Sequence, residues 1–121
     1  MYQRGVRGAT TLERNTVENL KEVVVELLTE MKKRNNYDEK DIASVFFSLT
    51  DDIDCVHPAK IAREVFPEWK YVPMMCYNEM RIKNSLTMCL RVLVNINTNL
   101  EQKDIHHVYL RSAEKLREDL K

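Results

Sequence analysis

The residues best suited to chemistry in this sequence are arginines placed inside apolar segments. Arg91 lies in the middle of the most apolar run of the chain, residues 87–98. Strand alternation would place Cys89, Arg91, Leu93 and Asn95 on one face and an apolar set on the other: Met88, Leu90, Val92, Val94 and Ile96. A guanidinium keeps its proton and is costly to bury without an anion. The pattern predicts an anionic partner for Arg91, either a protein carboxylate or a ligand. Taken alone, an internal ion pair or an arginine reaching to the strand edge is the simpler interpretation.

Other segments add polar side chains beside apolar positions: Arg7 between Gly5 and Gly8, Tyr109 in the segment 105–110, Cys76 and Glu79 in or after an extended segment, and Lys60 and Arg63 on a short helix. Individually, Tyr109 has a simpler interpretation as a strand aromatic, Cys76 as an apolar filler, and Lys60 and Arg63 as surface cations, whereas Arg7 between two glycines favours neither interpretation. Together they supply hydrogen-bond donors and positive charge. They predict a pocket that binds a small polycarboxylate and stabilises its charge.

Machinery for acid, base or nucleophilic catalysis is not indicated. The sequence context of the three histidines, His57, His106 and His107, marks none of them as a base beside a nucleophile. Glu79 lacks the second carboxylate that a paired-carboxylate hydrolase uses. Asp51 and Asp52, with Thr50, are typical of a turn rather than a metal site, because no third ligand follows at metal spacing.

The elements that must position these residues follow from periodicity. A helix is predicted from Asn15, with Asn15 as its cap, Glu18 completing a capping box, and Asn35 and Asn36 at its end. Its apolar stripe is Val17, Leu20, Val24, Leu27 and Met31, and its remaining charged residues form a solvated face: Lys21, Glu22, Glu26, Glu30, Lys32 and Lys33.

Extended segments are predicted at residues 2–11, 42–49, 69–76, 87–98 and 105–110, the third of them an edge strand because it contains Pro73. Pro58 is expected to begin a short helix that Pro67 stops, and residues 112–121 to form a short helical turn. The pattern predicts one α+β domain, residues 1–121, with about five strands and one main helix.

Composition excludes several classes of protein. The 19 basic residues balance the 19 acidic ones without a basic stripe, which argues against a nucleic-acid partner. Apolar runs are too short to span a membrane, and the N-terminus lacks the apolar core of a signal peptide, so a cytoplasmic location is expected. Cys55, Cys76 and Cys89 have no metal or disulfide spacing.

In combination, these segments resemble the AroH-type monofunctional chorismate mutases over essentially the whole chain. The segments that carry the resemblance are residues 4–11, 58–60 with Arg63, Trp69 with 71–73, Cys76 with 79–80, 89–92, and 107–110 with 116–117. It implies a mixed five-stranded sheet with one long helix and short helices, a Bacillus chorismate mutase-like fold. It also implies a homotrimer, a pseudo-α/β barrel with active sites between subunits, and no metal or organic cofactor.

The reaction that the resemblance implies is the Claisen rearrangement of chorismate to prephenate, in phenylalanine and tyrosine biosynthesis. Arg91 would stabilise charge at the ether oxygen, Arg7 and Tyr109 would bind a carboxylate, and Glu79 with the Cys76 region would hold the ring hydroxyl. The remaining substrate-binding residues would be His57, Ala59, Lys60, Arg63, Met75, Leu116 and Arg117.

Four positions depart from the family pattern. His57 stands where Phe is usual, Met75 replaces a small hydroxyl residue, and Arg81 and Asn84 replace an acidic residue and a glycine. These substitutions would affect affinity and pH profile more than the reaction. Two alternatives remain at this point: a non-catalytic trimeric module that binds a small dicarboxylate, and a purely structural assembly subunit.

Overall fold

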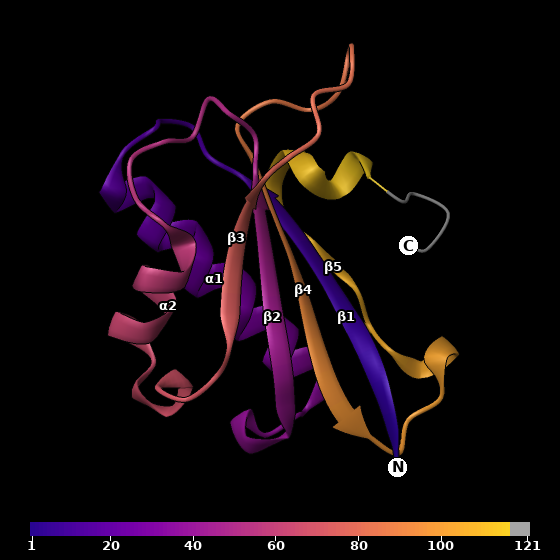
Figure 1. Cartoon of the computed structure of the whole chain (residues 1–121). Coiled ribbons are helices and arrows are strands. Elements are labelled where there is room, and N and C mark those ends of the chain that lie inside the picture. The colour runs from indigo at the N-terminus through magenta and orange to yellow at the C-terminus, as the bar shows by residue number, and fades with distance from the viewer. Residues whose placement is uncertain (117–121) are drawn as a thin grey trace.

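A mixed sheet of five strands in the order β3-β2-β4-β1-β5 forms the centre of the computed structural model, which describes residues 1–116 (Figure 1). The strands are β1 (Tyr2–Thr11), β2 (Ile42–Leu49), β3 (Met74–Asn78), β4 (Cys89–Thr98) and β5 (Val108–Tyr109). Antiparallel pairing joins β1 to β4 and β4 to β2, whereas β3 and β5 pair in parallel at the two edges. The prediction of an α+β chain with about five strands and one main helix is confirmed.

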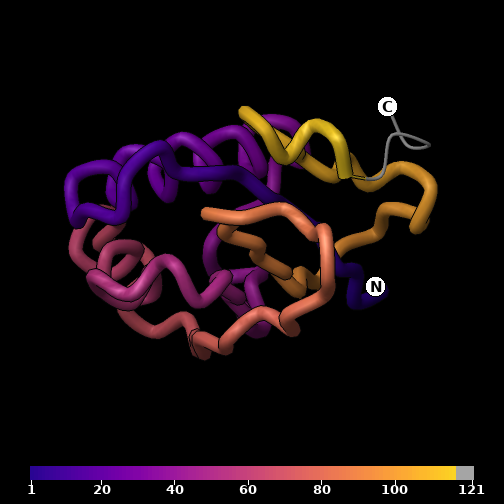
Figure 2. The backbone as a smooth tube through the Cα atoms, turned by 90° about the horizontal axis from the view of Figure 1, so that it is seen from above, coloured from indigo at the N-terminus to yellow at the C-terminus, as the bar shows by residue number. Residues whose placement is uncertain are grey.

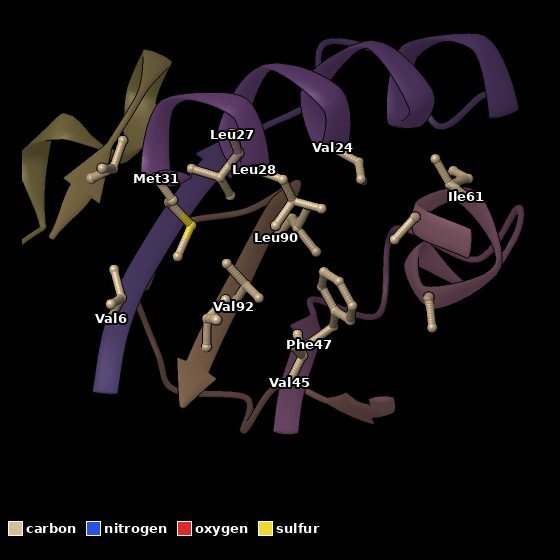
Figure 3. Packing of buried hydrophobic residues seen from close by; sticks show 14 of the residues in the cluster. Val6, Val24, Leu27, Leu28, Met31, Val45, Phe47, Ile61, Leu90 and Val92 are labelled. Atoms are coloured by element: carbon tan, nitrogen blue, oxygen red, sulfur yellow. The ribbon is translucent and has the colours of Figure 1, made fainter. Parts of the chain in front are cut away.

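Helices α1 (Val17–Asn35) and α2 (Pro58–Val65) lie on one side of this sheet. Figure 3 shows side chains of β1, β4 and β2 pointing toward α1, with Ile61 of α2 beside them. The predicted alternation of β4 is correct, because Leu90, Val92, Val94 and Ile96 are all buried in this core. The opposite face, which carries Arg91, has no helical layer among residues 1–116; it is called the open face below.

The start of α1 differs from the predicted one. Thr16, not Asn15, is the N-cap, and its Oγ1 accepts a hydrogen bond from the Asn19 backbone N–H at 3.1 Å. Asn15 instead bonds Asp54 across the loop that precedes α2. The first residue of the predicted stripe, Val17, is exposed because it lies at the start of α1, before the first buried residues of the helix, Asn19 and Leu20. The end of the helix is as predicted, since Asn36 adopts the left-handed conformation of a C-cap, with φ 51°.

Three strand boundaries also differ from the prediction. Trp69 belongs to a 3-10 turn, Pro67–Trp69, and β3 begins only at Met74, after Pro73, although it is an edge strand as expected. β4 begins at Cys89 because Met88 has a positive φ. The segment 105–110 contributes only Val108 and Tyr109 to the sheet. The 3-10 turn Arg111–Lys115 follows, and the rest of the predicted tail helix, residues 117–121, lies outside the described residues.

The position of β5 depends on buried polar contacts more than on strand pairing. The Asn35 side chain bonds both the backbone N–H and the carbonyl of His106, each at 2.8 Å. Nδ1 of His107 accepts a hydrogen bond from the Arg7 backbone N–H at 3.0 Å. These contacts join the end of α1 and the middle of β1 to the segment just before Tyr109. A strand of two residues is thereby held in register.

Figure 2 shows that the β3–β4 connection, residues 79–88, arches over one end of the sheet. At the start of this connection, the Glu79 backbone N–H bonds the carbonyl of Leu49 at 2.7 Å. Asp52, in the turn after β2, accepts hydrogen bonds from Thr50 and from the Met88 backbone N–H. The Thr50–Asp52 turn therefore has the structural role that its composition predicted.

Candidate active site on the open face

One row of paired residues crosses all five strands on the open face. Tyr77 of β3 pairs with Ser48 of β2, Ser48 with Arg91 of β4, Arg91 with Ala9 of β1, and Ala9 with Tyr109 of β5. Paired residues in a sheet share a face. Ala9 is the smallest residue of the row, so no long side chain stands between Arg91 and Tyr109.

The next row brings Arg7 to the same face, because Arg7 pairs with Leu93 and Leu93 with Phe46. Arg7 and Arg91 both line a hollow of about 210 Å³, together with Ser48 and Tyr77. The sequence predicted that Arg7, Arg91 and Tyr109 would be displayed away from the core, and their strand registers place all three on one face.

Arg91 has a protein carboxylate beside it. Its Nε lies 3.0 Å from Oε1 of Glu79, and the two side chains are 32% and 24% exposed. The Nε–H does not reach hydrogen-bond geometry with that oxygen and has no other partner among residues 1–116. The ion pair that the sequence left open therefore exists.

Ser48 is a member of this site that the sequence did not reveal. Its hydroxyl donates a hydrogen bond to Oε1 of Glu79 at 3.1 Å, the same oxygen that faces Arg91. A serine on a strand carries no motif, and only the pairing of β2 with β4 brings it opposite Arg91. Glu79 is therefore fixed at its backbone, where the N–H bonds the Leu49 carbonyl, and at its carboxylate, which accepts the hydrogen bond from Ser48.

Tyr109 presents a phenol without a hydrogen-bond partner among residues 1–116. Its hydroxyl is buried and makes no hydrogen bond to any other described residue. Buried hydroxyls in folded proteins are nearly always bonded, and leaving one unpaired costs about 1–3 kcal/mol. With the guanidinium groups of Arg7 and Arg91 on the same face, a hydroxyl that is unpaired among residues 1–116 suits the binding of an anion.

The electrostatic balance of this part of the face is positive. Arg7 has no carboxylate partner among residues 1–116, so Arg7 and Arg91 outnumber Glu79. Burial raises the pKa of the Cys89 thiol, and the neighbouring Arg91 guanidinium opposes that shift only in part. The thiol is therefore neutral near pH 7 and does not offset the positive charge of Arg91.

A second group of predicted site residues lies apart from this row. His57 and Cys76 line a second hollow of about 220 Å³, which shares Tyr77 with the hollow beside Arg91. Cys76 pairs with the core residue Phe47 and packs against the core, so it lies on the face opposite to Met75. Ala59 is buried on α2, and Lys60 and Arg63 are exposed on it, on the helical side of the sheet. One copy of the chain does not join these residues to Arg91.

Of the positions that depart from the family pattern, His57 belongs to this second group and Arg81 and Asn84 lie in the β3–β4 connection. Met75 pairs with Phe46, in the same open-face row as Arg7. Met75 is 55% exposed on the edge strand, where its sulfur accepts a hydrogen bond from Tyr77. Arg81 forms an ion pair with Asp51, and Asn84 takes a positive φ of 65°, the conformation for which glycine is favoured. Leu116 is half-buried at the end of the described residues, and Arg117 lies outside them.

Within residues 1–116, no group of three or more histidine, cysteine, aspartate or glutamate side chains could hold a metal ion. In the same part of the chain no helix has the length and apolarity needed to cross a membrane.

Comparison with known proteins identifies the family. Residues 3–120 match the family model of chorismate mutase type I. The chain is 39% identical to chorismate mutase AroH of Bacillus subtilis (strain 168), over 99% of this chain and 94% of that one. It is 37% identical to chorismate mutase AroH of Thermus thermophilus, over 97% of this chain and 95% of that one.

A solved chorismate mutase structure from Clostridium thermocellum superposes with a TM-score of 0.88 at 40% identity, covering 93% of this chain and 98% of the other. Sequence and fold therefore agree over nearly the full length of the chain. The chain belongs to the type I chorismate mutases, the enzymes that isomerise chorismate to prephenate.

Proposed function

We propose that this chain rearranges chorismate to prephenate on the open face, with Arg91 as the principal catalytic residue. The observation that carries the proposal is the single face that Arg7, Arg91 and Tyr109 share, together with a Tyr109 hydroxyl that has no hydrogen-bond partner within residues 1–116. Chorismate has two carboxylates, a hydroxyl and an ether oxygen. With Glu79, this set of side chains offers partners for the ether oxygen, one carboxylate and the hydroxyl.

The rearrangement is pericyclic, so it needs no acid, base or nucleophile. As the ether bond breaks, negative charge develops on its oxygen, and a fixed cation there stabilises the transition state more than the ground state. Arg91 is assigned this role. An acceleration of about a millionfold corresponds to about 8 kcal/mol, and losing one fixed donor costs about 3–4 kcal/mol. Holding the reactive conformer must supply the remainder.

Glu79 has two assigned roles. Its Oε1 lies between Ser48 and Arg91, which fixes the direction of the guanidinium. Its carboxylate can also accept a hydrogen bond from the ring hydroxyl of the substrate. Arg7 and Tyr109 are assigned to a substrate carboxylate, and their placement on adjacent strands β1 and β5 supports one shared group.

We also propose that the complete site forms between subunits of a homotrimer. Two arginines and one glutamate leave a single net positive charge on the open face, whereas chorismate is a dianion. Lys60 and Arg63, with His57, Ala59 and the β3 residues Met75 and Cys76, would complete the wall from a neighbouring copy, and Leu116 and Arg117 would close its mouth. Sedimentation equilibrium should give three times the chain mass of 14.3 kDa.

Mixed trimers test the shared site directly. Arg91→Ala and Lys60→Ala remove residues from the two separate groups, so each variant alone should be strongly impaired. If the groups meet across an interface, trimers co-expressed from both variants contain some intact sites and regain part of the activity. Activity no higher than the mean of the two variants would contradict a shared site.

The activity itself is tested by mixing the purified protein with chorismate and following its absorbance. Loss of chorismate with formation of prephenate, in metal-free buffer without added cofactor, is expected. A non-catalytic module that binds a small dicarboxylate would bind chorismate in a calorimeter and leave it unchanged.

We further propose that residues 1–121 form one catalytic domain that acts in the cytoplasm in phenylalanine and tyrosine biosynthesis.

A further inference from the structure

An arginine with a strained backbone lies just after the last strand of the sheet. Arg111 follows Tyr109 by two residues and begins the 3-10 turn Arg111–Lys115. Its φ is 53°, in the left-handed region that residues with long side chains rarely adopt. Three other non-glycine residues among 1–116 have a positive φ, and two of them are asparagines, which tolerate it better. Strain of this kind persists only where surrounding contacts fix it, and it is common beside functional sites.

The side chain of Arg111 makes such contacts with α1. Its Nε donates a hydrogen bond to Oε1 of Glu26 at 3.1 Å. Its Nη2 donates to Oε2 of Glu26 and to Oε1 of Glu22, both at 3.3 Å. Two nitrogens of a guanidinium on two oxygens of one carboxylate form a bidentate pair, which fixes direction better than a single contact does. Arg111 therefore joins the segment after β5 to a helix near the other end of the chain.

Two hydrogen bonds to β1 flank the strained residue. The Leu110 N–H donates to the Ala9 carbonyl at 2.9 Å. The Ser112 N–H donates to Oγ1 of Thr11 at 3.2 Å. The left-handed turn at Arg111 lies between these two bonds, so both can form only while that turn is kept.

Tyr109 is the residue whose position depends on this arrangement. β5 pairs with β1 through only Val108 and Tyr109, and the contacts of Asn35 and His107 hold the segment before it. The contacts of Arg111 hold the segment after it. The strand that carries the Tyr109 hydroxyl is thus anchored on both sides.

We propose that Arg111 is a positioning residue for the rearrangement, because its ion pairs with α1 hold the turn that keeps Tyr109 in place. The proposal rests on the function proposed for the open face, where Tyr109 is assigned to a substrate carboxylate. Without the ion pairs, residue 111 would relax to a negative φ and β5 would shift. Tyr109 is assigned to binding and Arg91 to the transition state, so loss of Arg111 should raise KM more than it lowers kcat.

Two substitutions of Arg111 separate its charge from its backbone. Arg111→Ala and Arg111→Gly remove the same positive charge, but only glycine adopts a positive φ without strain. Arg111→Ala should raise KM for chorismate about three- to tenfold, the contribution of the Tyr109 hydrogen bond. Arg111→Gly should raise it less. An increase for glycine equal to or larger than that for alanine would overturn the proposal.

The helix side of the ion pair has a matched control. Glu26→Ala should raise KM about two- to fivefold, the contribution of a partly exposed ion pair. Removal of a negative charge would by itself favour a dianionic substrate, so this rise is opposite to a long-range charge effect. Glu30→Ala makes the same change one turn further along α1, where Glu30 pairs only with Arg34, and should leave KM unaltered. Equal KM values for the two variants would contradict the role of the ion pair.

A double-mutant cycle shows whether Arg111 acts through Tyr109. Tyr109→Phe already lacks the hydroxyl, so adding Arg111→Ala should change KM by less than about twofold. If the two effects multiply instead, Arg111 does not act through Tyr109 and the proposal fails.

Amide hydrogen exchange tests the arrangement without reference to activity. In Arg111→Ala, the Leu110 and Ser112 amides should exchange at least about tenfold faster, while the amide of Val94, buried in β4, should be unaltered. Unaltered exchange at Leu110 and Ser112 would overturn the proposal even in an active enzyme. An inactive wild-type chain would refute the function proposed for the open face, and the exchange rates would still decide whether Arg111 holds β5.

Discussion

The two faces of β4 differ in how deeply their side chains are buried and in whether their polar atoms have hydrogen-bond partners. On the core face, Leu90, Val92, Val94 and Ile96 are at most 4% exposed and pack beneath α1. On the open face, the side chain of Arg91 is 32% exposed, and its Nε–H and the Tyr109 hydroxyl lack hydrogen-bond partners within residues 1–116. One strand thus contributes stability through one face and ligand binding through the other. Substitutions at neighbouring positions should separate the two properties.

The largest effect on stability is expected from Leu90→Ala. Leu90 is fully buried, so the lost contacts and the resulting cavity should cost about 2–5 kcal/mol in the free energy of unfolding. Leu93→Ala, three residues along on the half-buried open face, should cost about 1 kcal/mol. Urea unfolding measures both. Equal costs would show that the open face is covered as completely as the core face in solution.

The two glycines of β1, Gly8 and Gly5, allow the core face and the open face to be compared by the space that each leaves for an added Cβ. A Cβ at Gly8 would meet Met31, Leu27 and Val92 in the core, with Sδ of Met31 only 2.4 Å away. Gly8→Ala should therefore destabilise by about 1–3 kcal/mol through overpacking.

Gly5→Ala is the control on the open face. The nearest atom to a new Cβ there is Cδ1 of Leu93 at 3.0 Å, on a half-buried side chain that can turn aside. The change in the free energy of unfolding should stay below about 0.5 kcal/mol, because alanine also restricts the unfolded chain. A larger loss than for Gly8→Ala would reverse the assignment of the two faces.

Glu79→Gln should affect activity more than stability. The variant keeps the shape of the side chain and an oxygen near Ser48, but it removes the charge beside Arg91. We expect kcat to fall about tenfold, or about 1.4 kcal/mol, with a smaller change in KM. An unchanged kcat would exclude Glu79 from the catalytic site.

Tyr109→Phe should have a smaller effect on activity than Glu79→Gln. It removes a hydroxyl that has no partner among the described residues, so the thermal midpoint should be unchanged or slightly raised. If the hydroxyl binds a substrate carboxylate, KM should rise about three- to tenfold. A lowered midpoint with normal KM would make it a structural residue instead.

Periodicity in the sequence predicted the two faces of β4, the buried stripe of α1 after Val17 and the start of α2, because each depends on local spacing. It missed the Thr16 cap, since Asn15 is an equally good local candidate and is engaged by Asp54 instead. The extent of β5 was overestimated because its position depends on contacts with distant parts of the chain, where Asn35 bonds His106 and the Arg7 backbone N–H bonds His107.

The candidate site was predictable only in part, because local spacing determines the face on which a side chain lies but not its neighbours on other strands. Alternation indicated that Arg7, Arg91 and Tyr109 point away from the core, but it could not give strand order, so Ser48 remained hidden until β2 was paired with β4. It also could not show that Glu79 lies beside Arg91 or that Met75 and Cys76 lie on opposite faces. Of the α2 residues, Ala59 was grouped with Arg91 by family resemblance alone, whereas Lys60 and Arg63 were also grouped with it by their positive charge.

Replacement of Arg91 by citrulline is the most direct test of the central claim. Citrulline keeps the shape and most of the donors of arginine and removes the positive charge. If a fixed cation at the ether oxygen stabilises the transition state, kcat for chorismate should fall by about a hundredfold to a thousandfold while the protein stays folded. A folded citrulline variant with near-normal kcat would contradict the electrostatic account.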